Sequence, residues 1–340
     1  MTTELYPGDY FGGAECHDLS KEQTLERKWL IDEIIKPELP NISDNVEKCL
    51  ELLTSDQVFK MPISNGAAND TESPSIRGII TRQSGYIVDF QAVVKFPQFH
   101  RGKPVLYKMD TGKKFPLLQI NSIILNLRGI LKLLDTLQQE EDDKEFVSSF
   151  SKVLQLLTQS INLLQNPPRE LVFPDNNNYA IKKMFSMPYT LCESTHHFMS
   201  LELVLFKNEI SIDFRNLTKV TKRPWCDIDE NTGKSFADKT RDELKTQRGK
   251  SISDILQQQG LHIEEPTLIN NILSNFSTET TTLAHAQDFL ARCITFDKKV
   301  VTECEKVLIT TSDPSLISIS SKLNGLENCV SNYYTNLKLV

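Results

Sequence analysis

The chain has 340 residues, of which 39% are hydrophobic and 24% are charged, and its formal net charge is -7. This length is enough for roughly two domains that each bury a core of their own. The negative charge argues against indiscriminate binding to phosphate backbones, so no nucleic-acid partner is expected.

Two helices are predicted near the N-terminus, after a leader. Residues 1–16 are rich in glycine and contain no secretory signal, so we expect this leader to be flexible or disordered. The first helix is predicted to begin near Ser20 and to end at Pro37 and Pro40. Its Trp29 is interpreted as a core residue in preference to a binding hot spot. The second helix has an apolar seam that consists of Ile42, Val46, Cys49 and Leu53.

Strand patterns replace the helical periodicity in the central region. Residues 64–75 are small, polar or proline and are predicted to form a flexible linker. Runs rich in Val, Ile, Tyr and Phe then predict strands over residues 77–81, 86–96 and 104–109. A later hairpin is predicted from residues 201–206 and 209–217, and we expect its strands to join the same sheet.

A pair of long amphipathic helices is predicted between these strand regions. The first opens at Phe115 and Pro116, and it has two neighbouring seams, which indicates a position inside a helical bundle. One seam consists of Ile120, Ile124, Leu127, Leu131 and Leu134, and the other of Ile123, Ile130, Leu133 and Leu137. The antiparallel return helix has a seam of Phe146, Phe150, Val153, Leu157, Ile161 and Leu164.

The C-terminal third is predicted to contain a loop followed by further helices. Residues 225–262 are dense in charge, glutamine and glycine, and are expected to be flexible or disordered, apart from a short helix near residues 252–259. Helices are predicted over residues 267–276 and 282–309. The last helix has a seam at alternating spacings of four and three, formed by Ile319, Leu323, Leu326, Val330, Tyr333 and Leu337.

A terminal helix frays unless another element covers its apolar seam. Because other segments of the same chain offer matching seams, we expect the C-terminal helix to pack within its own chain. An intermolecular zipper is the alternative, since both arrangements give the same sequence pattern.

These elements predict an α+β fold, in which an antiparallel helical bundle built from N- and C-terminal helices accompanies a small antiparallel β domain from the central region. The bundle domain is expected to comprise residues 17–60, 115–187 and 266–340. The β domain is expected to comprise residues 75–112 and 198–220. Residues 1–16, 64–75 and 225–262 are expected to be flexible or disordered.

No catalytic, cofactor-binding or metal-binding constellation is predicted. The triplet at residues 110–112 matches that of aspartic proteases, but no second triplet exists to share a proton with it. His196 and His197 are adjacent, so in an extended chain their rings point to opposite faces. The cysteines lack metal-ligand spacing and are interpreted as reduced thiols. An enzyme with an unrecognised site around His196 and Glu202 is the alternative from a different class.

A basic cluster provides the candidate partner contacts, which are Lys219, Lys222, Arg223 and the neighbouring Trp225. Such a cluster fits an acidic partner or anionic lipid. The alternative is a solvated strand end that leads into a loop. The longest nearly unbroken apolar stretch, residues 198–206, is far shorter than the roughly 20 residues that cross a bilayer, so no membrane span is expected.

Four local features follow one another in a distinctive order. They are Trp29-Leu30-Ile31 followed by Asp32-Glu33, then Val94-Lys95-Phe96-Pro97 at a strand end, then Met184-Phe185 before the second hairpin, and finally the leucine-zipper-like terminal helices. In this order the chain resembles the Rogdi leucine-zipper-containing family, from residue 22 to residue 337. Residues 225–265 are longer than the family pattern requires.

The resemblance implies one bundle of helices from both chain ends and a second domain of central strands, without catalytic residues or cofactors. The family's fungal member is the smaller subunit of the RAVE complex, the regulator of the vacuolar and endosomal proton-pumping ATPase. The implied partners are a large propeller-containing subunit of the RAVE complex, a Skp-type adaptor and the peripheral sector of the vacuolar proton ATPase. The implied location is cytoplasmic, with peripheral recruitment to vacuolar and endosomal membranes.

We therefore expect a non-enzymatic subunit that promotes assembly or reassembly of the vacuolar-type proton ATPase and acts as a protein-binding scaffold. A helical vesicle-tethering or trafficking adaptor is the alternative from the same broad class.

Overall fold

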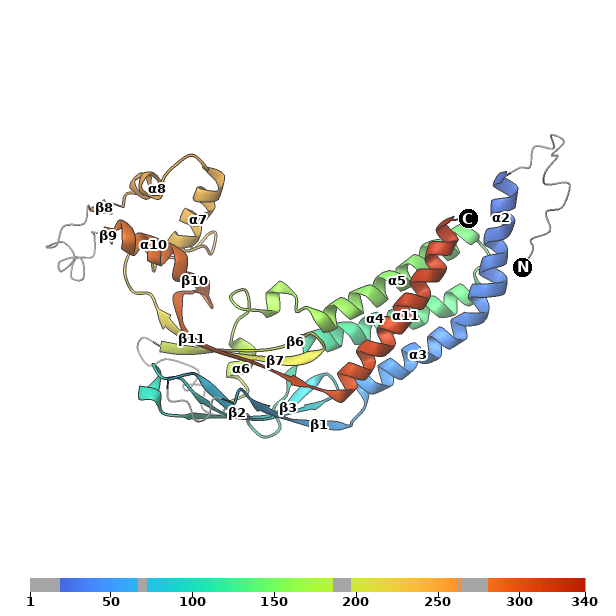
Figure 1. Cartoon of the computed structure of the whole chain (residues 1–340), viewed down its shortest axis with the longest axis horizontal. Helices are drawn as coiled ribbons and strands as arrows, with labels where there is room; N and C mark the ends of the chain where they lie inside the picture. Colours follow the sequence, from blue (N-terminus) through green and yellow to red (C-terminus); the bar gives the residue numbers. More distant parts are fainter. Residues whose placement is uncertain (1–18, 67–71, 186–196, 262, 265–280, 340) are drawn as a thin grey trace, which may run out of the picture. The chain divides into compact units, whose positions relative to one another are not determined.

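The computed structural model describes residues 19–66, 72–185, 197–261, 263–264 and 281–339 (Figure 1). The predicted leader, the predicted helix over residues 267–276 and His196 lie outside these ranges. The chain divides into two compact units. The first consists of the described parts of Met1–Leu52, Ile123–Asn162 and Ile319–Val340, and the second of those of Leu53–Ser122 and Leu163–Ser318.

The first unit is a helical bundle to which both ends of the chain contribute (Figure 1). It is built from α2 (Leu19–Trp29), the π-helix η1 (Leu30–Ile35) and most of α3 (Lys36–Thr54), α4 (Leu118–Gln139), α5 (Asp143–Gln165) and α11 (Pro314–Leu339). The ends of these last four helices, residues 53–54, 118–122, 163–165 and 314–318, belong to the second unit. Side chains also link the helices: the Asn126 amide donates to the Ser160 hydroxyl at 3.2 Å, and the Thr158 hydroxyl to Glu327 at 3.5 Å. The α+β prediction, with its bundle built from both chain ends, is confirmed.

Apolar residues at helical spacing form the core of this bundle. They are Ile42, Val46 and Cys49 on α3, Ile123, Leu127, Ile130, Leu134 and Leu137 on α4, Phe146, Phe150, Val153 and Leu157 on α5, and Ile319, Leu323, Leu326, Val330 and Leu337 on α11. On α4 the buried stripe takes members from both predicted seams, while Ile124 and Leu131 are half-buried, as is Tyr333 on α11. Ile120 is buried in the second unit. The wide apolar arc of α4 thus faces more than one neighbour.

The N-terminal helices continue through Pro37 and Pro40, where the sequence predicts an end. The π-helical turn η1 directly precedes α3, and the Lys36 N–H donates to the Ile31 carbonyl five residues earlier. This longer hydrogen-bonded ring changes the geometry where an α-helical turn would clash with the Pro37 ring. Leu39 beside Pro40 is buried, so packing of this face offsets the cost of the prolines.

Within the described residues, the second unit contains two larger antiparallel sheets and one short pair of strands. The first sheet has the order β1 (Val58–Ser64), β2 (Ser75–Gln83), β3 (Tyr86–Lys95), β4 (Val105–Lys108), and β5 (Phe115–Pro116) also pairs with β3. The second has the order β10 (Cys293–Phe296), β11 (Lys299–Ser312), β7 (Glu209–Lys219), β6 (His197–Phe206). Strands β8 (Ile263–Glu264) and β9 (Thr281–Thr282) pair in parallel.

Short helices connect these strands. They are η3 (His100–Gly102), η4 (Arg169–Leu171), α6 (Tyr179–Lys182), α7 (Phe236–Thr246), α8 (Ile252–Gln258) and α10 (Leu283–Arg292). Phe115 and Pro116, predicted to open a helix, form β5 instead, and α4 begins at Leu118.

The predicted hairpin does not join the first sheet. Its strands β6 and β7 pair with each other, and β7 pairs with β11 from Glu209 to Lys219. The two sheets pack face to face: the Phe214 ring lies 6.1 Å from that of Phe90 and 5.2 Å from that of Tyr107, between ring centroids. The single sheet expected from the sequence is therefore two layers.

The prediction of one helix over residues 282–309 is correct only for its first part, α10. The chain then forms the hairpin β10–β11, with positive φ angles of 47° at Asp297 and 60° at Lys298 in its turn. The apolar spacing in this region fits a helix by coincidence, whereas its many β-branched residues favour a strand. Pairing along β7 decides the outcome, and residues 281–318 consequently belong to the second unit.

Candidate functional site

The predicted basic contacts lie at the end of β7, and they differ in exposure. Lys219 and Arg223 are exposed, Lys222 is half-buried, and Trp225 is fully buried. The Arg223 Nε lies 3.6 Å from a carboxylate oxygen of Asp227. The cationic side chains are therefore accessible at the surface, but Trp225 is not, and its assignment as a partner contact is corrected.

Trp225 is buried because the stretch predicted to be disordered folds over it. Its ring stacks on Phe289 of α10 at 5.0 Å between centroids, and the Phe236 ring of α7 meets it edge-on at 5.2 Å. Leu256 of α8 and Leu290 of α10 belong to the same apolar cluster. We call α7, α8 and α10 the helical cap. Aromatic packing between residues far apart in the sequence supplies the core that a charge-rich composition did not indicate.

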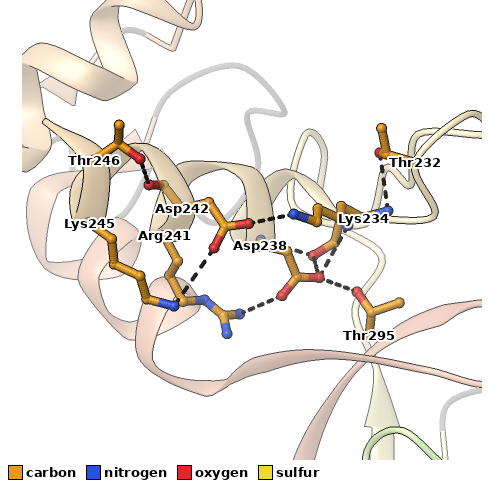
Figure 2. Close-up of polar contacts among 9 residues, drawn as sticks. Thr232, Lys234, Asp238, Arg241, Asp242, Lys245, Thr246 and Thr295 are labelled. Carbon is orange, nitrogen blue, oxygen red and sulfur yellow. Dashed lines mark hydrogen bonds and ion pairs between the residues drawn. The ribbon is translucent and has the colours of Figure 1, made fainter.

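Charged residues of the helical cap pair with one another (Figure 2). Ser235 and Asp238 form a capping box at the start of α7, and Asp238 also accepts from the Thr295 hydroxyl at 2.5 Å. Lys234 lies 2.7 Å from Asp242, and Arg241 donates to the Cys293 carbonyl. Burial acts to raise the pKa of Asp238, but its hydrogen bonds from Ser235 and Thr295 outweigh burial and hold that pKa below the usual 3.8. These contacts stabilise the cap and do not form a reactive site.

Glu202, a residue of the enzyme alternative, is buried in β6. The Phe173 N–H donates to its carboxylate at 2.6 Å. Burial raises the pKa of Glu202 above the ordinary 4.5, and this hydrogen bond opposes the increase. Its cross-strand neighbour Asp213 is paired with Arg215 at 2.6 Å and with Lys306 at 3.2 Å. The arrangement is a buried ionic network across β6, β7 and β11.

A cleft of about 280 Å³ lies beside this network and is lined in part by Gln119, Leu171 and Asn176. Gln119 is itself occupied, because its amide donates to the Leu205 carbonyl at 2.9 Å and accepts from the Leu205 N–H at 2.7 Å. These contacts extend the edge of β6 with a side chain. They join the first turn of α4, which belongs to the second unit, to β6 of the same unit.

The part of the chain that the structure describes contains no group of three or more His, Cys, Asp or Glu side chains able to hold a metal ion. Among the cysteines in the described ranges, Cys49 and Cys293 are buried. Burial raises the pKa of the Cys49 thiol to about 11 and that of Cys293 to about 12, so neither is a poised nucleophile. Among the helices in the described ranges, none is long and apolar enough to cross a membrane.

Two exposed apolar surfaces stand out, and sequence reasoning missed both. Leu25 and Trp29, four residues apart on α2, are 68% and 56% exposed, so the interpretation of Trp29 as a core residue is wrong. Leu30, Ile31 and Ile35 occupy the core instead. The second surface is the outer face of the first sheet. The signal was available there, because strand alternation puts Ile79 on the opposite face from the buried Ile80.

Comparison with known proteins identifies the family. The family described as Rogdi leucine zipper containing protein matches residues 26–338. A Saccharomyces cerevisiae protein described as regulator of V-ATPase in vacuolar membrane protein 2 is 51% identical over 341 aligned residues, which cover 99% of this chain and 97% of that protein. Both matches include the bundle, the two sheets and the helical cap. The chain therefore belongs to the Rogdi leucine zipper family.

Proposed function

We propose that this protein regulates the vacuolar-type proton ATPase as a non-enzymatic subunit of a complex that promotes the pump's assembly or reassembly. The proposal rests on the yeast relative, which is described as a regulator of V-ATPase in the vacuolar membrane and matches 99% of this chain. Identity of 51% along both units makes a shared set of binding surfaces the simplest expectation.

A scaffold role agrees with what the surface offers. Exposed Trp29 on α2 is a side chain of the kind that anchors protein interfaces, and exposed Leu25 precedes it by four residues on the same helix. The outer face of the first sheet adds exposed aliphatic residues. The buried charged groups Asp213, Arg215 and Glu202 are engaged in structural contacts. Binding through several surfaces of one folded chain is what a scaffold subunit requires.

The proposed partners are the large propeller-containing subunit of the RAVE complex, a Skp-type adaptor and the peripheral sector of the pump. The proposed location is cytoplasmic, with peripheral recruitment to vacuolar and endosomal membranes. Lys219, Lys222 and Arg223 stay proposed contacts for an acidic partner.

Loss of the protein tests this function directly. In cells that lack it, we expect the vacuolar lumen to become less acidic and the peripheral sector of the pump to leave the membrane fraction. Re-expression of the wild-type chain restores both. Normal pump assembly in the deleted cells would contradict the proposal. As a matched test of the enzyme alternative, a chain with His196→Ala and Glu202→Gln should restore assembly as the wild type does.

A further inference from the structure

We infer that the outer face of the first sheet is a docking site for an acidic segment of a protein partner that also contains aliphatic side chains. This inference rests on the proposed function, because it assigns one binding surface to the scaffold. It uses strands β1 to β4, all within the second unit.

Register fixes which residues share this face. Two cross-strand rows run over the sheet, and each takes one residue from each of the four strands. The first row is Pro62, Ile79, Gln91 and Lys108, and the second is Ser64, Arg77, Val93 and Leu106. Neighbours in adjacent rows are within reach of one another. Ile79, Val93 and Leu106 therefore form one aliphatic stripe across β2, β3 and β4.

This stripe is exposed although it lies on a sheet. Leu106 is 51% exposed, Val93 43% and Ile79 38%. In the second sheet, by contrast, nearly all residues of β6 are buried on both faces. The outer face of the first sheet also has a groove of about 670 Å³, where the outward residues Ser64 and Ser75 contribute only small side chains. A contiguous apolar surface with a hollow is typical of an interaction site.

The charge of this face indicates which kind of partner binds there. Counted over the described residues of β1 to β4, the outward positions hold the cations Lys60, Arg77, Lys95 and Lys108 and the single carboxylate Asp89. This face is therefore basic in a chain whose net charge is -7. Charge complementarity favours an acidic partner.

The shape favours a polypeptide over a lipid surface. The groove floor includes Ile79 and Val93, while Arg77 and Lys95 also line it. A peptide segment places aliphatic side chains in such a hollow and acidic side chains on the flanking cations. A membrane surface contacts protruding cations first and leaves a hollow unfilled.

The test uses the full-length protein with two purified probes, the large propeller-containing subunit and the peripheral sector of the pump. A carbodiimide joins lysines to carboxylates without a spacer, so we expect Lys60 or Lys108 to be linked to Asp or Glu residues of one probe. The variants Ile79→Asp and Arg77→Glu should each weaken binding of that probe by about tenfold or more.

The matched controls lie on α4, where Leu125 and Lys132 are exposed. Leu125→Asp and Lys132→Glu make the same changes in polarity and charge on an element of the first unit, and should leave affinity unchanged. Circular dichroism melts establish that each variant is folded. A variant that fails to fold is replaced by Lys108→Glu, which lies at an exposed edge position.

Three results would overturn the inference. Folded variants that bind both probes as the wild type does would exclude this face. An equal loss of binding in the α4 control variants would show that the effect is not specific to the face of the sheet. Loss of binding to vesicles of phosphatidylcholine and phosphatidylserine in equal parts, with protein binding retained, would assign the face to lipid. In each case, the proposed function is still supported if the wild-type protein binds the peripheral sector of the pump. If the wild-type protein does not bind that sector, the result counts against the proposed function itself.

Discussion

A buried ion pair joins β2 to the start of α11 within the second unit. The Arg82 Nε donates to Asp313 at 2.5 Å, and both side chains are inaccessible to solvent. Arg82 also donates to the Ser84 carbonyl at 2.5 Å and to the Ser315 hydroxyl. The second oxygen of Asp313 accepts the Ser315 N–H at 2.9 Å. One carboxylate therefore neutralises the arginine and caps the helix.

Removing the arginine should leave this carboxylate buried without a counterion. We expect Arg82→Met to lower the free energy of unfolding by roughly 3 to 5 kcal/mol, measured by urea denaturation at neutral pH. Adding Asp313→Asn removes the unpaired charge and keeps an oxygen for the cap, so the double variant should recover part of the loss. A single variant as stable as the wild type would show that the pair contributes nothing.

Glu202 gives stability a defined pH dependence. Burial raises the pKa of this carboxyl in the folded state above 4.5, so the folded chain holds the proton more tightly than the unfolded chain. Stability from this group is then greatest at low pH and decreases as the pH rises through the folded pKa. Relative to Glu202→Gln, the wild type should lose stability over that interval. If urea denaturation showed the same change in the free energy of unfolding from acid to neutral pH for both proteins, this expectation would be contradicted.

At the scale of single elements, the helical cap depends on its capping boxes. Ser235 is buried, and its partner Asp238 also binds Thr295, whereas the equivalent Ser251 of α8 is exposed. We expect Ser235→Ala to cost about 1 kcal/mol and to speed hydrogen exchange in α7. Ser251→Ala is the matched control and should have the smaller effect. Equal exchange in both variants would mean that the link to Thr295 adds nothing.

The elements differ in how far their sequences specify them. The helices α4, α5 and α11 were predictable because 3.6-residue periodicity is a local signal that survives in many contexts. The secondary structure of β11 was not predictable in this way. Its sequence fits either periodicity, and the strand forms because β7, some ninety residues earlier, offers a matching edge.

At the scale of the whole molecule, the bundle requires helices from three separate parts of the chain. Leu127 on α4 and Leu326 on α11 are both buried in it. Leu127→Ala and Leu326→Ala should each lower the free energy of unfolding by about 2 to 5 kcal/mol, because each leaves a cavity in a packed core. Thermal or urea unfolding measures the loss.

Leu125 on the same helix is the control for this prediction, since it is largely exposed. Leu125→Ala should change stability by no more than about 0.5 kcal/mol. Binding of partners by the folded core variants should be normal. If the free energy of unfolding were unchanged in Leu127→Ala and Leu326→Ala, these residues would not belong to the core of the bundle.

The candidate surfaces follow the same division between local and distant information. The sequence identified the basic residues Lys219, Lys222 and Arg223, because charge is visible in a linear chain. It misjudged both tryptophans, placing Trp29 in the core and Trp225 at the surface. The exposure of a large aromatic ring depends on what packs over it, and Phe289 is sixty-four residues from Trp225.

The amino-acid sequence by itself determined the helical bundle, the first strands and the membership of the Rogdi leucine zipper family, since these depend on periodicity and on the order of short motifs. The tertiary structure alone decided that β6 and β7 pair with β11, that the helical cap folds around Trp225, and that Ile79, Val93 and Leu106 meet on an open face. The physical reason is that strand pairing and burial are set by contacts between distant residues, for which local propensity carries no information.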